Sequence, residues 1–116
     1  MPYLSIETNL DANNIDANTL LSDTSTFIAN LLGKPEKYVM VKLQCNSSLI
    51  FSGNQKTLAY LELKSIGLPE QETTEYASAI CQHISESLNI NSDRIYIEFS
   101  NAQRHMFGWN GKTFQT

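Results

Sequence analysis

The sequence has few of the residues that bind metals or form disulfides, with two cysteines and two histidines among 116 residues. Cys45 and Cys81 lie 36 positions apart and belong to no Cys-x-x-Cys motif. We expect free thiols, with a disulfide between them as the alternative. His83 and His105 are too far apart in sequence for a recognisable zinc site. We therefore expect neither a metal nor a cofactor.

Long apolar runs and an excess of positive charge are also missing. No segment approaches the roughly 20 apolar residues that span a bilayer, and the first residues lack the regions of a signal peptide. We therefore expect a cytoplasmic protein without a membrane partner, and export without a signal peptide is the alternative. The 8 Lys and Arg against 12 Asp and Glu give a net charge of −4, which argues against a nucleic-acid partner. The length fits a single domain over residues 1–116.

What the chain does contain is apolar residues that recur with two periods. Alternation of apolar and polar positions predicts four strands, over residues 2–8, 39–43, 58–64 and 95–99. Apolar residues at three- and four-residue spacing predict two helices, over residues 20–32 and 77–88. Asp16 or Asn18 is the expected N-cap of the first helix, and Gly33 is its expected end.

The second half of the chain weakly repeats the first. A shift of 57 residues places Tyr3 on Tyr60, and a shift of 56 aligns the second strand with the fourth. We therefore expect an α+β fold of two pseudo-repeated βαβ units, with a four-stranded sheet and both helices on one face. Short C-terminal strands follow, with a turn at Asn110-Gly111. Such a domain leaves one sheet face uncovered, and self-association is the simplest way to cover it.

The familiar catalytic motifs are absent. Gly33-Lys34 is not part of a phosphate-binding loop, because Ile28 and Pro35 occupy positions where that motif requires glycine and Ser or Thr. The chain has no G-x-S-x-G motif, and neither histidine lies in a recognisable nucleophile motif.

Pro2 opens the first strand directly after the initiator methionine. Proline at this position normally allows removal of Met1, which leaves a secondary amine at the chain terminus. Such an amine is a base only when neutral, and both burial and a nearby cation lower its pKa. Lys34 is a candidate for that cation if its loop folds toward the first strand. The alternative is that Pro2 only begins an edge strand.

Several short groups of residues occur in order from one end of the chain to the other, and end with Phe114. The groups are Pro2-Tyr3-Leu4-Ser5-Ile6-Glu7-Thr8-Asn9, Gly33-Lys34-Pro35, Ser65-Ile66-Gly67, Asp93-Arg94-Ile95-Tyr96-Ile97 and Gly108-Trp109-Asn110. Each group alone is weak, but their collinear spacing is specific. Together they resemble the macrophage migration inhibitory factor family of the tautomerase superfamily.

The resemblance implies a homotrimer of paired βαβ units with active sites at the subunit interfaces. It also implies keto–enol tautomerisation of a small aromatic α-keto acid such as phenylpyruvate, and of dopachrome-type substrates. Carried over to this sequence, Pro2 would be the base, while the Lys34 ammonium and the Ile66 N–H would hold substrate oxygen atoms. Tyr96 of the adjacent subunit would line the pocket. The apolar wall would consist of Tyr38, Phe107 and Trp109.

Simpler roles exist for the same residues. Lys34 could be a solvated charge that complements the end of a helix, and the others could be packing or interface residues. The sequence also departs from the family pattern. Glu98 stands beside the expected substrate where asparagine is common, and Lys64 replaces a frequent histidine. Leu58 and Leu61 replace the family's C-x-x-C, so we expect no thiol-oxidoreductase activity.

Three functional hypotheses follow. The leading one is a tautomerase enzyme. The second is a cytokine-like signalling or host-modulating protein that binds receptors through its surface and has a vestigial site. The third is a module that only trimerises.

Overall fold

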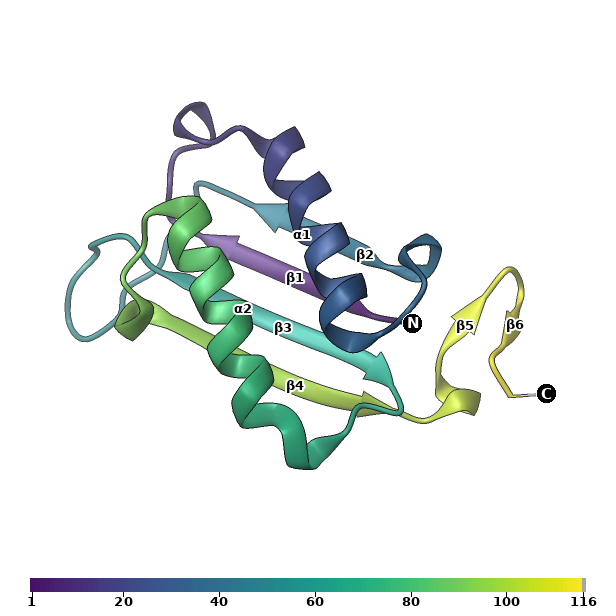
Figure 1. The fold of residues 1–116 in the computed structure, drawn as a ribbon. Helices are drawn as coiled ribbons and strands as arrows, with labels where there is room; N and C mark the ends of the chain where they lie inside the picture. The colour runs from purple at the N-terminus through teal and green to yellow at the C-terminus, as the bar shows by residue number, and fades with distance from the viewer. Residues whose placement is uncertain (116) are drawn as a thin grey trace.

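The computed structural model describes residues 1–115 as two layers, a sheet with helices on one side (Figure 1). The strands and helices in chain order are β1 Tyr3–Thr8, α1 Ala17–Leu32, β2 Met40–Gln44, β3 Ala59–Ile66, α2 Thr73–Leu88, β4 Ile95–Ala102, β5 Gly108–Trp109 and β6 Lys112–Thr113. Short 3-10 helices lie at Ala12–Asn14, Glu36–Tyr38, Glu70–Glu72, Ser92–Arg94 and Arg104–Met106. The predicted α+β class and element order are confirmed.

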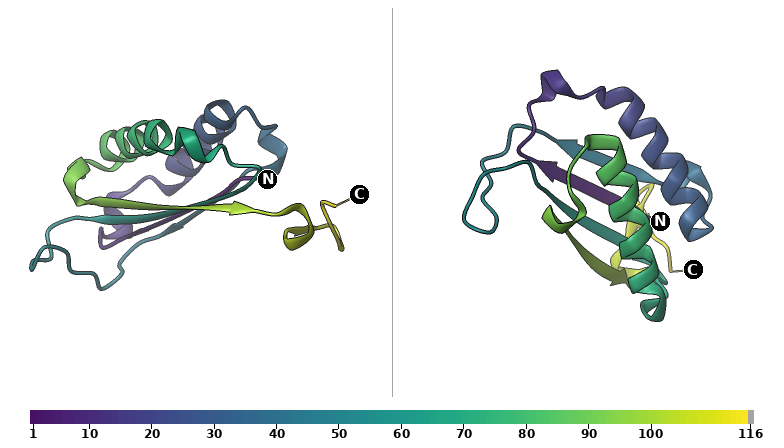
Figure 2. Two further views of the ribbon diagram at one scale, coloured as in Figure 1. Left: turned by 90° about the horizontal axis from the view of Figure 1, so that it is seen from below. Right: turned by 60° about the vertical axis from the view of Figure 1, so that its left-hand side comes forward.

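The four long strands form one mixed sheet in the order β2-β1-β3-β4. β1 is parallel to β2 and β3 is parallel to β4, while β1 and β3 are antiparallel. Both helices lie on the same face, and the β5–β6 hairpin extends beyond one end of the sheet (Figure 2). Within residues 1–115, no helix has the length and apolar character needed to cross a membrane.

The strand registers confirm the predicted internal repeat. Tyr3 of β1 pairs with Met40 of β2, and Tyr60 of β3 pairs with Tyr96 of β4. These two pairs are related by the shifts of 57 and 56 residues that the sequence predicted. The two βαβ halves therefore pair their strands in equivalent registers.

Local sequence signals determine where the first helix begins and ends. The Asp16 carboxylate accepts hydrogen bonds from the backbone N–H and the hydroxyl of Thr19, so Asp16 is the N-cap. Gly33 ends α1 in the left-handed region at φ 65°, which is the expected role of glycine after a helix. The predicted turn at Asn110-Gly111 is also present, with both residues at positive φ between β5 and β6.

The hydrophobic core lies between the sheet and the helices. Alternate residues of β1 and β3 point toward the helices and are completely buried, as are residues from one face of each helix. These buried residues are Leu4, Ile6, Ile28, Leu61, Leu63, Ile80 and Ile84. Cys45 and Cys81 are free thiols and are only partly buried. Because successive side chains of a strand point to opposite faces, the completely buried apolar residues of β1 and β3 all lie on the sheet face that packs against the helices.

The other sheet face is open and polar. Across the middle of the sheet, Ser5 of β1 pairs with Lys42 and with Glu62, and Glu62 pairs with Glu98. These side chains are polar and do not require an apolar partner to cover them. The need to cover the sheet, which the sequence indicated as a reason for self-association, therefore does not apply to the middle of this face. Exposed large apolar side chains lie instead toward the ends of the sheet and in the flanking segments, namely Met40, Ile50, Tyr96, Met106 and Trp109.

Candidate active site

A cavity of about 340 Å³ lies at the end of the sheet where β1 begins. Tyr3 borders it and pairs with two other lining residues, Met40 of β2 and Lys64 of β3. Met1 and Pro2 lie along the same cavity. The rest of the lining comes from the 3-10 helix before β2, through Tyr38, and from the C-terminal region, through Phe107, Gly108, Trp109 and Phe114.

The aromatic side chains of this cavity pack against one another. The Tyr38 ring meets Trp109 edge-on at 5.8 Å between centroids, and Trp109 stacks on Phe114 at 6.2 Å. The backbone N–H of Phe114 donates to the carbonyl oxygens of Phe107 at 3.1 Å and Arg104 at 3.2 Å. These bonds hold Phe114 beside Phe107, and both residues line the cavity. An aromatic wall of this kind suits an aryl ligand.

The chain terminus lies in a partly desolvated and positively charged environment. Pro2 is less than 2% exposed, and its carbonyl oxygen accepts a 3.0 Å hydrogen bond from the Met40 N–H. Burial, and secondarily the charge of Lys34, lower the pKa of the Met1 amino group. Lys34 follows Gly33, the residue that ends α1, so the cation reaches the terminus from the helix side of the sheet.

Ile66 lies at the same end of the sheet. The antiparallel register pairs Tyr3 with Lys64, and its continuation places Met1 opposite Ile66 at the end of β3. Ile66 is buried and does not itself line the cavity. The structure therefore brings the predicted residues Pro2, Tyr38, Phe107 and Trp109 into one cavity, with Lys34 and Ile66 beside its amine.

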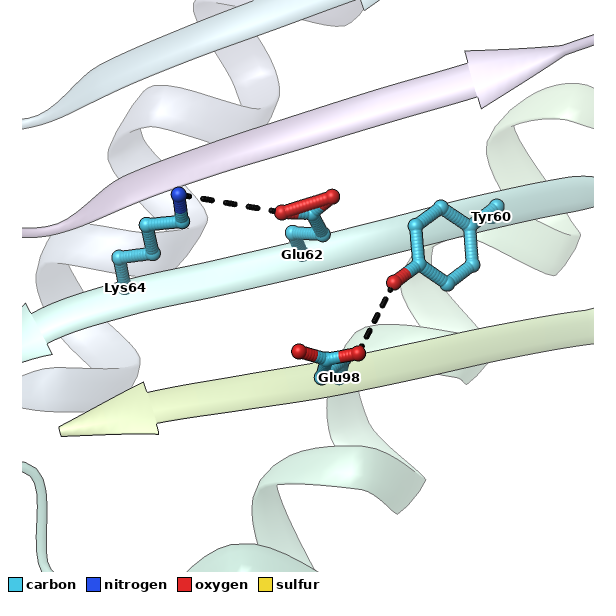
Figure 3. Close-up of polar contacts among 4 residues, drawn as sticks. All are labelled: Tyr60, Glu62, Lys64 and Glu98. Carbon is cyan, nitrogen blue, oxygen red and sulfur yellow. Dashed lines mark hydrogen bonds and ion pairs between the residues drawn. The ribbon is translucent and has the colours of Figure 1, made fainter.

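The remaining predicted residues lie elsewhere in a single chain. Tyr96 is 62% exposed. It lies four residues before Ser100, the β4 residue that pairs with Lys64 at the cavity. About 13 Å of strand therefore separates Tyr96 from that position. Its ring contacts Phe51 at 5.0 Å beside a second cavity of about 240 Å³. Glu98 lies on the open face, where its carboxylate accepts a 3.1 Å hydrogen bond from the Tyr60 hydroxyl (Figure 3).

Several residues that line the cavity beside Pro2 were not among the predicted site residues. They are Met1, Tyr3, Met40, Lys64, Gly108 and Phe114. Alternation along each strand places Tyr3, Met40 and Lys64 on the open face, but only the strand order and register align them in one row. The predicted turn at Asn110-Gly111 was the sequence signal from which the proximity of Phe114 to Phe107 could have been inferred.

Comparison with known sequences gives a consistent result along the whole chain. Residues 1–115 match the profile of the family described as macrophage migration inhibitory factor (MIF). A macrophage migration inhibitory factor homolog from Trichinella spiralis is 34% identical over 115 residues, which cover 98% of this chain and 100% of the relative. The macrophage migration inhibitory factor of Xenopus tropicalis is 30% identical over 115 residues, with coverage of 98% and 99%.

Solved structures support the same relationship. The crystal structure of a macrophage migration inhibitory factor homologue from Prochlorococcus marinus is 46% identical, with a TM-score of 0.91 over 97% of this chain and 98% of the other. The structure of the Trichinella spiralis factor is 32% identical, with a TM-score of 0.92 and coverage of 97% and 99%. Sequence and fold therefore agree over nearly the full length of each protein.

Proposed function

The chain belongs to the macrophage migration inhibitory factor family, and we propose that it is a keto–enol tautomerase with Pro2 as its base once Met1 is removed. Its substrates would be phenylpyruvate-like α-keto acids and dopachrome-type compounds. The observation that carries the proposal is the position of Pro2, which is buried beside an aromatic cavity and next to an amine of lowered pKa.

The reaction needs a base that is neutral near pH 7. In the keto-to-enol direction, the Pro2 nitrogen takes a proton from the carbon next to the carbonyl, and the electron pair of that C–H bond forms the enolate. The protonated amine then delivers the proton to the enolate oxygen. Burial and Lys34 disfavour the charged form of the terminal amine in the structure. Removal of Met1 would transfer the amine to the more deeply buried Pro2, where the same two effects favour a neutral base.

Lys34 and Ile66 would stabilise the negative charge of the substrate. The Lys34 ammonium would attract the carboxylate of the α-keto acid, and the Ile66 N–H would donate to an oxygen that becomes negative in the enolate. Their position at the terminus, with Lys34 after α1 and Ile66 at the end of β3, supports these roles. The substrate ring would contact Tyr38, Phe107 and Trp109.

We also propose that the active form is a homotrimer whose subunits complete each site. Tyr96 is too far along β4 to reach the cavity of its own chain, yet its exposed ring lies beside other apolar groups around Phe51. A neighbouring copy would bring Tyr96 to the wall of the cavity. Glu98 would approach from the same strand, two residues beyond Tyr96.

The test is turnover of phenylpyruvate by a Pro2→Gly variant. Glycine keeps a terminal amine but loses the secondary amine and the fixed ring, so kcat/KM should fall about 100-fold or more, the usual scale of general-base catalysis. A Pro69→Ala variant, changed before the 3-10 helix Glu70–Glu72, should keep its activity. If Pro2→Gly remains folded and retains full turnover, the reaction does not depend on the secondary amine and ring of Pro2.

A further inference from the structure

Lys64 places a positive charge on the cavity lining, whereas Lys34 acts on the amine at the chain terminus. Lys34 follows α1, so it approaches the chain terminus from the side of the sheet that the helices cover. Lys64 belongs to the open face, because the residues that flank it in β3, Leu63 and Ser65, are buried toward the helices. The two cations can therefore meet different parts of one ligand.

Lys64 is also available for a ligand. Its ammonium lies 3.9 Å from the Glu62 carboxylate, which is an ion pair beyond hydrogen-bond distance, and the Lys64 side chain is 48% exposed (Figure 3). An exposed pair of this length holds its partners weakly. Lys64 lines the cavity and Glu62 does not, so a ligand anion can compete for the ammonium.

The other surroundings of Lys64 define the body of that ligand. Tyr3 lies directly opposite Lys64, and Met40 lies on the far side of Tyr3 in the same row. The aromatic cluster around Trp109 and Phe114 forms the facing wall. The cavity volume of about 340 Å³ falls in the range of small-molecule sites. A flat apolar body with an acidic group at its far end fits these features.

We propose that Lys64 is a specificity-determining residue that binds a carboxylate on the ring of an aryl α-keto acid. The inference rests on the proposed function, in which Lys34 and the terminal amine receive the α-keto acid end. The preferred substrate is then an aryl pyruvate with two acidic groups, and unsubstituted phenylpyruvate is the poorer member of the class.

Steady-state kinetics with phenylpyruvate and 4-carboxyphenylpyruvate test this assignment. In a Lys64→Met variant, which removes the charge and keeps the length, KM for the carboxylated substrate should rise about fivefold, the scale of one charged hydrogen bond at a half-exposed site. KM for phenylpyruvate and kcat for both should stay nearly constant. Lys64→Arg should restore the preference, and Lys42→Met, a lysine on the open face outside the cavity lining, should not alter it.

A second variant should act in the opposite direction. Glu62→Gln removes the carboxylate that competes for Lys64, so KM for 4-carboxyphenylpyruvate should fall. The proposal is wrong if Lys64→Met changes KM for both substrates equally or for neither, or if Glu62→Gln fails to lower KM for the carboxylated one.

Binding of inert analogues separates this inference from the proposed function. Calorimetry should show that the wild-type protein binds 4-carboxycinnamate about five times more tightly than cinnamate, and that Lys64→Met abolishes the difference. If the wild-type protein turns over neither keto acid but keeps this binding preference, the tautomerase proposal fails and the role of Lys64 stands. If the protein turns over phenylpyruvate but shows no preference that depends on Lys64, the tautomerase proposal stands and the role of Lys64 fails.

Discussion

Replacing Arg94 with methionine should release the loop that precedes β3 and destabilise the fold. The Arg94 guanidinium donates hydrogen bonds of 3.0–3.3 Å to four backbone carbonyl oxygens of this loop, those of Phe51, Asn54, Lys56 and Thr57. It also lies 5.2 Å from the centre of the Phe51 ring. One side chain therefore holds four carbonyls of the loop together, including those of Phe51 and Asn54, which also bond to each other's backbone N–H. It also lies against the ring that contacts Tyr96.

The magnitude follows from these contacts. The bonds to Phe51 and Asn54 are part-buried and the other two are exposed. Two part-buried bonds of about 1 kcal/mol each, with a smaller contribution from the exposed bonds and the cation–π contact, predict a loss of about 3 kcal/mol. For a domain of this size, that loss lowers Tm by roughly 10 °C.

Urea unfolding at a fixed protein concentration is the appropriate assay, since self-association makes apparent stability concentration-dependent. Arg94→Lys should recover less than half of the loss, because an ammonium has no planar fork to reach several carbonyls. Arg104→Met is the matched control, because the Arg104 side chain has no hydrogen bond within residues 1–115. A loss below about 0.5 kcal/mol for Arg94→Met, or full recovery by lysine, would refute the geometric reasoning.

Two further predictions concern polar groups that are partly or fully buried. Burial lowers the pKa of His83 despite the opposing charges of Asp23 and Glu86, so the unfolded chain binds a proton more readily than the folded one. The free energy of unfolding should therefore be constant above about pH 6.5 and should fall as the pH drops below it, and urea titrations of His83→Gln should show a weaker slope. Thr8→Val should cost about 1–3 kcal/mol in the same assay, because the buried Thr8 hydroxyl donates a 2.7 Å bond to a backbone carbonyl across the sheet. Ser65→Ala should cost little by comparison, since the buried Ser65 hydroxyl has no partner within the described part of the chain; equal losses for the two variants would contradict this account.

The elements of the fold were predictable because their signals are local. Alternation defined the strands, three- and four-residue spacing defined the helices, and Asp16 and Gly33 marked the ends of α1. The repeat also anticipated the equivalent strand registers of the two halves. Periodicity could not show that the open face is rich in charge at its centre and apolar toward its ends, because that pattern depends on which strands are neighbours.

The site was predictable only in part, for a related physical reason. Pro2 was identified from its place after Met1, while Tyr38 and Trp109 were assigned only through the resemblance, and the structure places all three on one cavity. Lys64 entered the prediction only as a departure from the family pattern, because its contact with the cavity depends on the register of β1 against β3. Tyr96 cannot be placed at the site by a single chain at all, since its expected contact belongs to a second copy.

If the free Pro2 amine performs the reaction, activity depends directly on the state of the chain terminus. Preparations with different extents of Met1 removal are analysed by intact-protein mass spectrometry and assayed with phenylpyruvate at equal total concentration. An amide nitrogen between Met1 and Pro2 has no basic lone pair, so the rate should be proportional to the fraction of chains that begin at Pro2 and should extrapolate to zero for chains that retain Met1. Full activity in a preparation that consists entirely of Met1-bearing chains would show that the Pro2 amine is not the base.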